Sequence, residues 1–221
     1  MVSYPEPEWT TPYRICDPFL ADRTPRMPSS VSAGIVSMIR NHFGSQERII
    51  DRRISSHLWH PDRRRTILLI EPAAMYTPEV AGNRPSVIVG IGKMGSIPVT
   101  ISGRTTVHMD SDNVFRGKDR IFKYSGEIPV IVRSSKPLET QIILEEIAVN
   151  FSIYGQEYAD SLALGELNVI GLEPTKTITE EEGGSVRSYI ASLFLKWTTI
   201  QDWTVATRGP LLRRGGITLP V

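Results

Sequence analysis

The chain contains one cysteine, Cys16, among 221 residues, and its formal net charge is +1. A single cysteine excludes an internal disulfide framework and is typical of a reducing compartment. Because the net charge is near zero, no overall field favours nucleic acid or a membrane surface as a partner. No apolar run reaches transmembrane length, and the N-terminus has no apolar segment of signal-peptide type. We therefore expect a soluble, non-secreted protein in which Cys16 is an ordinary buried or exposed thiol.

The sequence also lacks a complete motif for catalysis, cofactor binding or metal binding. Residues 90–95, GIGKMG, match GxGxxG, but the following SIPVTISG favours a strand where a dinucleotide fold requires a helix. His57 and His60 could lie on one side of a helix, yet a zinc site needs two further ligands. Residues 109–113, MDSDN, lack the glycine and glutamate of a calcium loop. We expect a loop, two ordinary histidines and a turn, with no catalytic residue, no cofactor and no metal.

Proline is concentrated in residues 1–28, which contain six of the 16 prolines. Proline prevents regular helix and removes the N–H donors of a strand ladder, so we expect an extended N-terminal arm. A flexible linker would carry glycine and serine. The arm instead carries aromatic residues, and we expect Trp9, Tyr13 and Phe19 to dock on the domain or on a neighbouring subunit.

Arginine is concentrated in two places. Residues 206–221 are expected to form an extended C-terminal tail, and residues 29–205 between the two arms a single domain. The arginines in both places are candidates for contact with phosphate or with an acidic subunit face. The alternative for the first group is a solvated loop that pairs with Glu47, Asp51 and Asp62, and the sequence leaves both open. The candidates are Arg48, Arg52, Arg53, Arg63, Arg64 and Arg65, and in the tail Arg208, Arg213 and Arg214.

The clearest structural signal is a strand at residues 128–135 that leads into a long helix over 136–151. Ser134 or Ser135 is expected to cap this helix, Pro137 suits its first turn, and Glu139 suits its positive end. Apolar residues recur at helical period and predict one buried face. That face comprises Leu138, Ile142, Ile143, Ile147 and Phe151.

The remaining pattern predicts an α+β fold, with a mainly antiparallel or mixed sheet packed on one face by one long helix and one or two shorter ones. A first helix over residues 29–44 is expected to be capped by Ser29 or Ser30. Residues 119–132 are predicted to form two strands joined at Ser125-Gly126, residues 155–164 a further short helix, and Gly183-Gly184 a hairpin tip. The other expected strands are residues 66–72, 86–92, 97–109, 167–174 and 188–205.

About residues 66–205 contain a series of elements in a fixed order. They are TILLIEP, RPSVIVGIG, SGRTTV, IPVIVRSS, the helix beginning KPLE, and the strand SLFLKWTTIQDWTV. This order resembles that of the tail-terminator and neck proteins of tailed bacteriophages. The resemblance implies a virion subunit that forms a ring, commonly hexameric, on the last ring of the tail tube. Such a ring joins the tube to the head connector, and DNA passes through its lumen.

The resemblance implies as partners the protein itself, the tail-tube protein and the head connector, without a membrane. Another head–tail adaptor, a stopper or a baseplate subunit is the nearest alternative. A nucleotide-using enzyme built around GIGKMG and a nucleic-acid binder built around the arginines are the alternatives from other classes.

Overall fold

The computed structural model describes residues 27–97, 107–109, 115–179 and 187–206. The chain divides into two compact units: Arg26–Val99 with Phe122–Gln201, and Met1–Pro25 with Thr100–Ile121 and Asp202–Val221. The predictions for both arms, for most of MDSDN and for the hairpin tip fall outside the described residues. These include Cys16, Trp9, Tyr13, Phe19, Arg208, Arg213 and Arg214.

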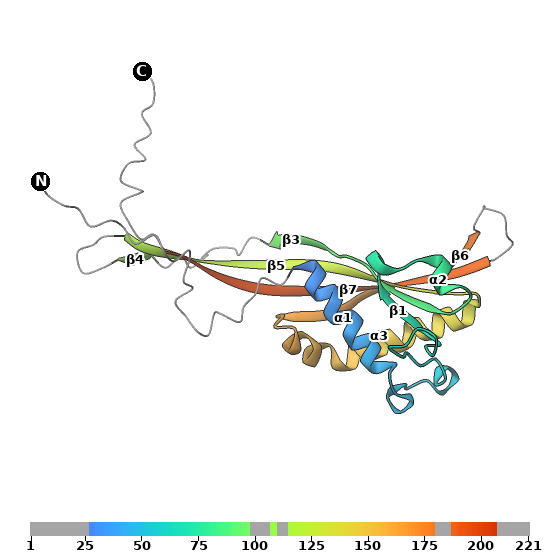
Figure 1. Cartoon of the computed structure of the whole chain (residues 1–221). Coiled ribbons are helices and arrows are strands. Elements are labelled where there is room, and N and C mark those ends of the chain that lie inside the picture. The colour runs from blue at the N-terminus through green and yellow to red at the C-terminus, as the bar shows by residue number, and fades with distance from the viewer. Residues whose placement is uncertain (1–26, 98–106, 110–114, 180–186, 207–221) are drawn as a thin grey trace, which may run out of the picture. The chain divides into compact units, whose positions relative to one another are not determined.

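The larger unit is built on a mixed sheet with the strand order β1-β2-β5-β7-β6 (Figure 1). The pairing of β1 with β2 is parallel, whereas β2 with β5, β3 with β5, and β6 with β7 pair antiparallel. The strands are β1 (Leu69–Pro72), β2 (Ser86–Val89), β3 (Lys93–Ile97), β5 (Phe115–Ser134), β6 (Glu166–Thr179) and β7 (Arg187–Ala206). In the smaller unit, β4 (Val107–Met109) pairs antiparallel with the first residues of β5.

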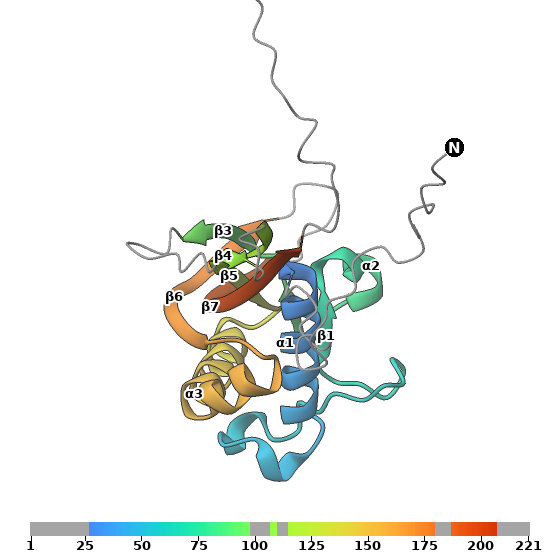
Figure 2. The same ribbon diagram turned by 90° about the vertical axis from the view of Figure 1, so that its left-hand side faces the viewer.

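Two helices pack on the same face of this sheet, α1 (Pro28–His42) and the long α3 (Pro137–Ser161). Figure 2 shows both helices beneath the sheet, with α1 beside β1. One short helix, α2 (Pro78–Ala81), and three short 3-10 turns, Gln46–Arg48, Arg52–Ile54 and Ala73–Met75, lie in the connections. The prediction of an α+β fold with a helix-covered mixed sheet is therefore confirmed.

The core forms where alternate strand residues meet the two helices. Val130 and Val132 of β5 point to the same side as the alternate residues of β7, because side chains in a strand alternate between faces. Burial of each such side chain stabilises the fold by about 1.5–3 kcal/mol. The cluster includes Ile35, Ile39, Ile143, Ile147 and Phe151 from the helices, and Leu193, Leu195 and Trp197 from β7.

The turn predicted at Ser125-Gly126 is wrong, because β5 is one continuous strand through both residues. Gly126 is buried, and a Cβ there would lie 2.6 Å from both the Trp197 ring and the Lys93 carbonyl oxygen. The glycine therefore lets the indole of β7 and the backbone of β3 approach the strand closely. A glycine that serves close packing has the same sequence signature as a turn.

The separate short helix predicted over residues 155–164 is also wrong, because α3 continues without a break to Ser161. The predicted short helix begins at Gly155, and glycine inside a helix is unfavourable by about 1 kcal/mol relative to alanine. In the structure a Cβ at Gly155 would lie 2.7 Å from the carbonyl oxygen of Leu167. The residue therefore permits β6 to pass close to the helix.

The predicted serine caps are wrong at both helices. The N-cap residues are Met27 and Lys136, neither of which makes a side-chain capping bond, and each is followed by proline. Leu138 is also misplaced, since 65% of it is exposed. Thr140 is fully buried, and two residues correspond to about 200° of helix rotation, so Leu138 faces away from the sheet.

Candidate functional site

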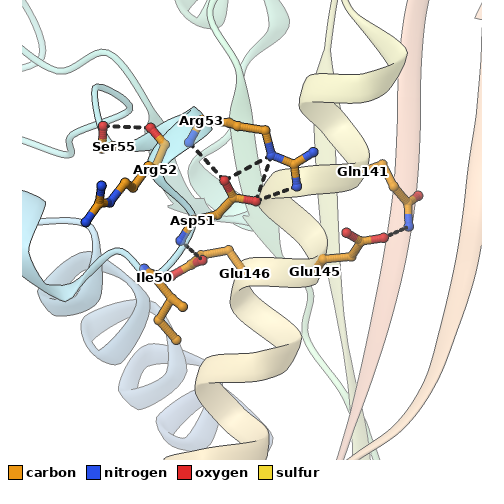
Figure 3. Close-up of polar contacts among 8 residues, drawn as sticks. All are labelled: Ile50, Asp51, Arg52, Arg53, Ser55, Gln141, Glu145 and Glu146. Atoms are coloured by element: carbon orange, nitrogen blue, oxygen red, sulfur yellow. Dashed lines mark hydrogen bonds and ion pairs between the residues drawn. The ribbon is translucent and has the colours of Figure 1, made fainter.

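The six clustered arginines lie in the segment that follows α1 and precedes β1. We call residues 45–65 of this segment the arginine loop. Glu146 of α3 holds this loop (Figure 3). Its Oε1 accepts hydrogen bonds from His42 Nε2 at 2.7 Å and from the Ile50 amide at 2.8 Å. Its Oε2 accepts one from the Asp51 amide at 3.0 Å. The arginine loop is thus fixed to both helices through one carboxylate that is only 3% exposed.

The hydrogen bonding continues from His42 into α3. Tyr158 donates its hydroxyl proton to Asn150 Oδ1 at 2.9 Å, and Asn150 Nδ2 donates to His42 Nδ1 at 2.9 Å. This direction places the imidazole proton on Nε2, facing Glu146. Burial raises the pKa of Tyr158 and outweighs the opposing effect of its hydrogen bond to Asn150. Because His42, Glu146 and Asn150 are all buried, this network supports the loop and does not reach a substrate.

Three of the six arginines bind partners within the same chain. Arg53 pairs with Asp51, and the Arg53 guanidinium lowers the pKa of this carboxyl through hydrogen bonds. Arg63 pairs with the buried Glu71 of β1 at 2.5 Å. Arg48 donates to the carbonyl oxygen of Asn41 at 2.7 Å. The alternative of a loop with internal pairing thus holds for these three, although only Asp51 is one of the partners expected from the sequence.

The other three arginines, Arg52, Arg64 and Arg65, are exposed. Their side chains form no hydrogen bond or ion pair with any residue that the structure describes. Arg52 directly follows the two amides that Glu146 holds. Arg64 and Arg65 lie in the turn at the end of the loop, where Asp62 accepts hydrogen bonds from both of their amides. These three exposed arginines are the candidate functional site.

A second polar cluster lies at the start of α3. Glu139 accepts hydrogen bonds from His57 Nε2, at 2.9 Å, and from Ser134 Oγ. Burial alone would raise the pKa of Glu139, but these two hydrogen bonds, together with the charges of His57 and Lys136, outweigh burial and lower it. Although serine, histidine and a carboxylate meet here, the carboxylate lies between the other two. A nucleophilic serine needs the histidine as its direct partner, so this arrangement does not activate Ser134.

Glu139→Gln is expected to reduce stability by about 1–2 kcal/mol at pH 7, because hydrogen bonds to an ionised carboxylate are lost. Since the folded pKa of Glu139 is lowered from 4.5, its contribution is present above that pH and is lost as pH falls below it. Urea denaturation from pH 7 to pH 3 measures this. The two proteins should converge in stability below pH 4.5, and a constant difference across the range would contradict the assignment.

The glycine segment leads from β2 into β3 and not into a helix, but the predicted loop is shorter than residues 90–95, because Lys93–Gly95 already belong to β3. A Cβ at Gly90 would lie 2.6 Å from the Pro129 ring, so packing accounts for this glycine. His57 bonds to Glu139, whereas His60 Nδ1 accepts from the Asp62 amide, so the two rings have separate partners. In the described part of the chain, no cluster of three or more histidine, cysteine or acidic residues suits a metal ion.

An open depression of about 530 Å³ lies beside the start of α3. Arg84, Lys136 and Glu139 contribute charges of both signs to its lining, together with Ser135. Because Arg84 donates to the carbonyl oxygens of Ala81 and Arg63, its guanidinium is already engaged. The depression therefore has less free charge than the arginine loop.

The structure thus combines an α+β fold with a basic loop that Glu146 holds at Ile50 and Asp51. No protein-family model and no curated protein matches the sequence. Among the helices that the structure describes, none combines the length and the apolar character needed to span a membrane.

Proposed function

We propose that this protein is a structural component of a virion, the ring-forming tail-terminator or neck subunit of a tailed bacteriophage. The observation that carries the proposal is the order of elements β1, β2, β5, α3, β6 and β7 in one sheet covered by helices. The resemblance to that family rests on β1, β2, β5, α3 and β7 of this order, together with the segment SGRTTV, most of which lies outside the described residues. The ring, commonly hexameric, caps the tail tube, contacts the head connector and surrounds the passing DNA.

The polar side chains support a binding role over a catalytic one. The buried network around Glu146 is used to position a loop, and Ser134 lacks a histidine partner. The segment after Gly92 is a strand, which leaves GIGKMG without the helix N-terminus that binds a pyrophosphate. A head–tail adaptor, stopper or baseplate subunit is the nearest alternative and would differ in its position within the particle.

The proposal predicts that the purified protein forms closed rings that bind the ends of tail tubes. Light scattering after size exclusion measures the mass, and negative-stain imaging with and without tubes of the same phage shows where the rings bind. Rings at tube ends are the expected result. Rings that bind only the head connector would favour an adaptor, and a strictly monomeric protein at high concentration would contradict the proposal.

A further inference from the structure

The C-terminal half of α3 carries an exposed stripe that the core does not use. We call Val149, Ile153, Glu157 and Asp160 the acidic stripe. Their spacings of four, four and three residues place them along one side of the helix. Val149 is 43% exposed and Ile153 54%, and both acids are exposed. Tyr154, 45% exposed, lies beside them.

The energetics of the isolated helix do not explain this stripe. α3 contains no lysine, arginine or histidine. Glu157 and Asp160 lie near the negative end of the helix dipole, where each acid is unfavourable by about 0.3–1 kcal/mol. Asp160 accepts a hydrogen bond from Gln156, but neither acid forms an ion pair with a described residue. A cationic partner from outside the subunit would relieve this repulsion.

The arginine loop offers the complementary chemistry. The side chains of Arg52, Arg64 and Arg65 form no ion pair with a described residue. Two isoleucines accompany them: Ile50 is 55% exposed and Ile67, two residues beyond the loop, 47%. The loop and its flank thus present both cations and exposed aliphatic side chains. The acidic stripe likewise presents both anions and exposed aliphatic side chains.

We propose that the arginine loop of one copy docks on the acidic stripe of a second copy. The inference rests on the proposed function as a ring subunit, for which it supplies the interface. The loop is bonded to Glu139 and Glu146 in the N-terminal half of α3, whereas the stripe begins at Val149 and continues toward the C-terminal end. Figure 1 shows the cyan loop beside the first half of the helix and the gold end of the helix farther away.

Because the two surfaces are different, their contact is head-to-tail. Each copy then uses its loop toward one neighbour and its stripe toward the other, and such contacts build closed rings when the rotation between copies closes. An isologous dimer would use one surface twice and would leave the other unoccupied. Because dissolved ions screen attraction between exposed opposite charges, assembly through these two surfaces should weaken as the salt concentration rises.

Two variants separate the surfaces: R52S/R64S/R65S removes the loop charges, and I153S/E157Q/D160N alters the stripe. All six residues are exposed, so both variants should keep the thermal midpoint and circular dichroism of the wild type. Each variant alone is expected to be monomeric in light scattering at concentrations where the wild type is assembled. An equimolar mixture should form a 1:1 dimer and nothing larger, because one intact loop meets one intact stripe.

The control is E173Q/K176S, which removes an exposed ion pair of β6 without touching either surface. It should assemble like the wild type. If both test variants still form wild-type rings, the interface is wrong while the ring subunit stands. If the loop variant forms rings but loses salt-dependent binding to DNA, the arginines contact phosphate and the inference is overturned. If the wild-type protein itself is monomeric, the proposed function and the interface both fail.

Discussion

Glu146→Ala is expected to lower the free energy of unfolding by about 3 kcal/mol or more, one of the two largest effects expected of a single substitution here. The carboxylate accepts hydrogen bonds from His42 Nε2 and from the amides of Ile50 and Asp51. Its removal leaves all three donors without this partner, and the His42 donor is buried. An unsatisfied buried donor is unfavourable by about 1–3 kcal/mol.

The neighbouring Glu145→Ala is the matched control, since Glu145 is exposed and, among the described residues, accepts a hydrogen bond from Gln141 Nε2 alone, at 2.8 Å (Figure 3). It should change stability by no more than about 0.5 kcal/mol. Urea denaturation measures both variants. Amide hydrogen exchange at Ile50 and Asp51 gives a specific readout, because Glu146→Ala should release these amides while leaving the strand amides protected. Equal losses for the two variants would show that Glu146 does not hold the loop.

Trp197→Ala should be comparably severe, with an expected loss of about 3–5 kcal/mol. Trp197 is among the largest side chains that are fully buried, and its ring packs against Gly126 of β5. Alanine would leave a cavity above Gly126, where the Trp197 ring now packs. Gly126 has no side chain that could fill this cavity. Thermal and urea denaturation measure the loss.

Trp197→Phe is the informative companion variant. The indole Nε1 has no hydrogen-bond partner among the described residues, so phenylalanine sacrifices no hydrogen bond and keeps most of the ring. We expect it to retain at least half of the stability that alanine loses. A phenylalanine variant as unstable as the alanine variant would mean that the indole nitrogen has a role that packing does not explain.

The fold class was predictable because periodicity dominates where elements are long. The alternation of Val130 and Val132 and the recurrence of Ile143, Ile147 and Phe151 marked the strand and the helix that the structure contains. Two of the errors involve glycines. Gly126 lies at the predicted turn and Gly155 at the start of the predicted short helix, yet each lies inside a regular element where a neighbouring strand approaches it closely. Such neighbours are distant in sequence, so local pattern alone cannot distinguish packing from turning.

The candidate site was predictable only in part. The cluster of arginines was visible as a charge bias, but which of them are engaged was not, because Glu71 and Asn41 become partners only through the fold. The network of His42 and Glu146 was missed entirely. The local signal is the position of Glu146 close to two core residues of the same helix, Leu144 and Ile147. A carboxylate at such a position is buried and needs hydrogen-bond donors from within the protein.

The anchoring of the arginine loop by Glu146 also sets an order of events. The bonded groups are 95 to 104 residues apart in sequence, so they can meet only after α3 has been synthesised. A nascent or misfolded copy therefore has arginines but no ordered surface to present. Under the proposed interface, only a completely folded copy is able to join a neighbour. The carboxylate would then act as a checkpoint that excludes immature subunits from the growing particle.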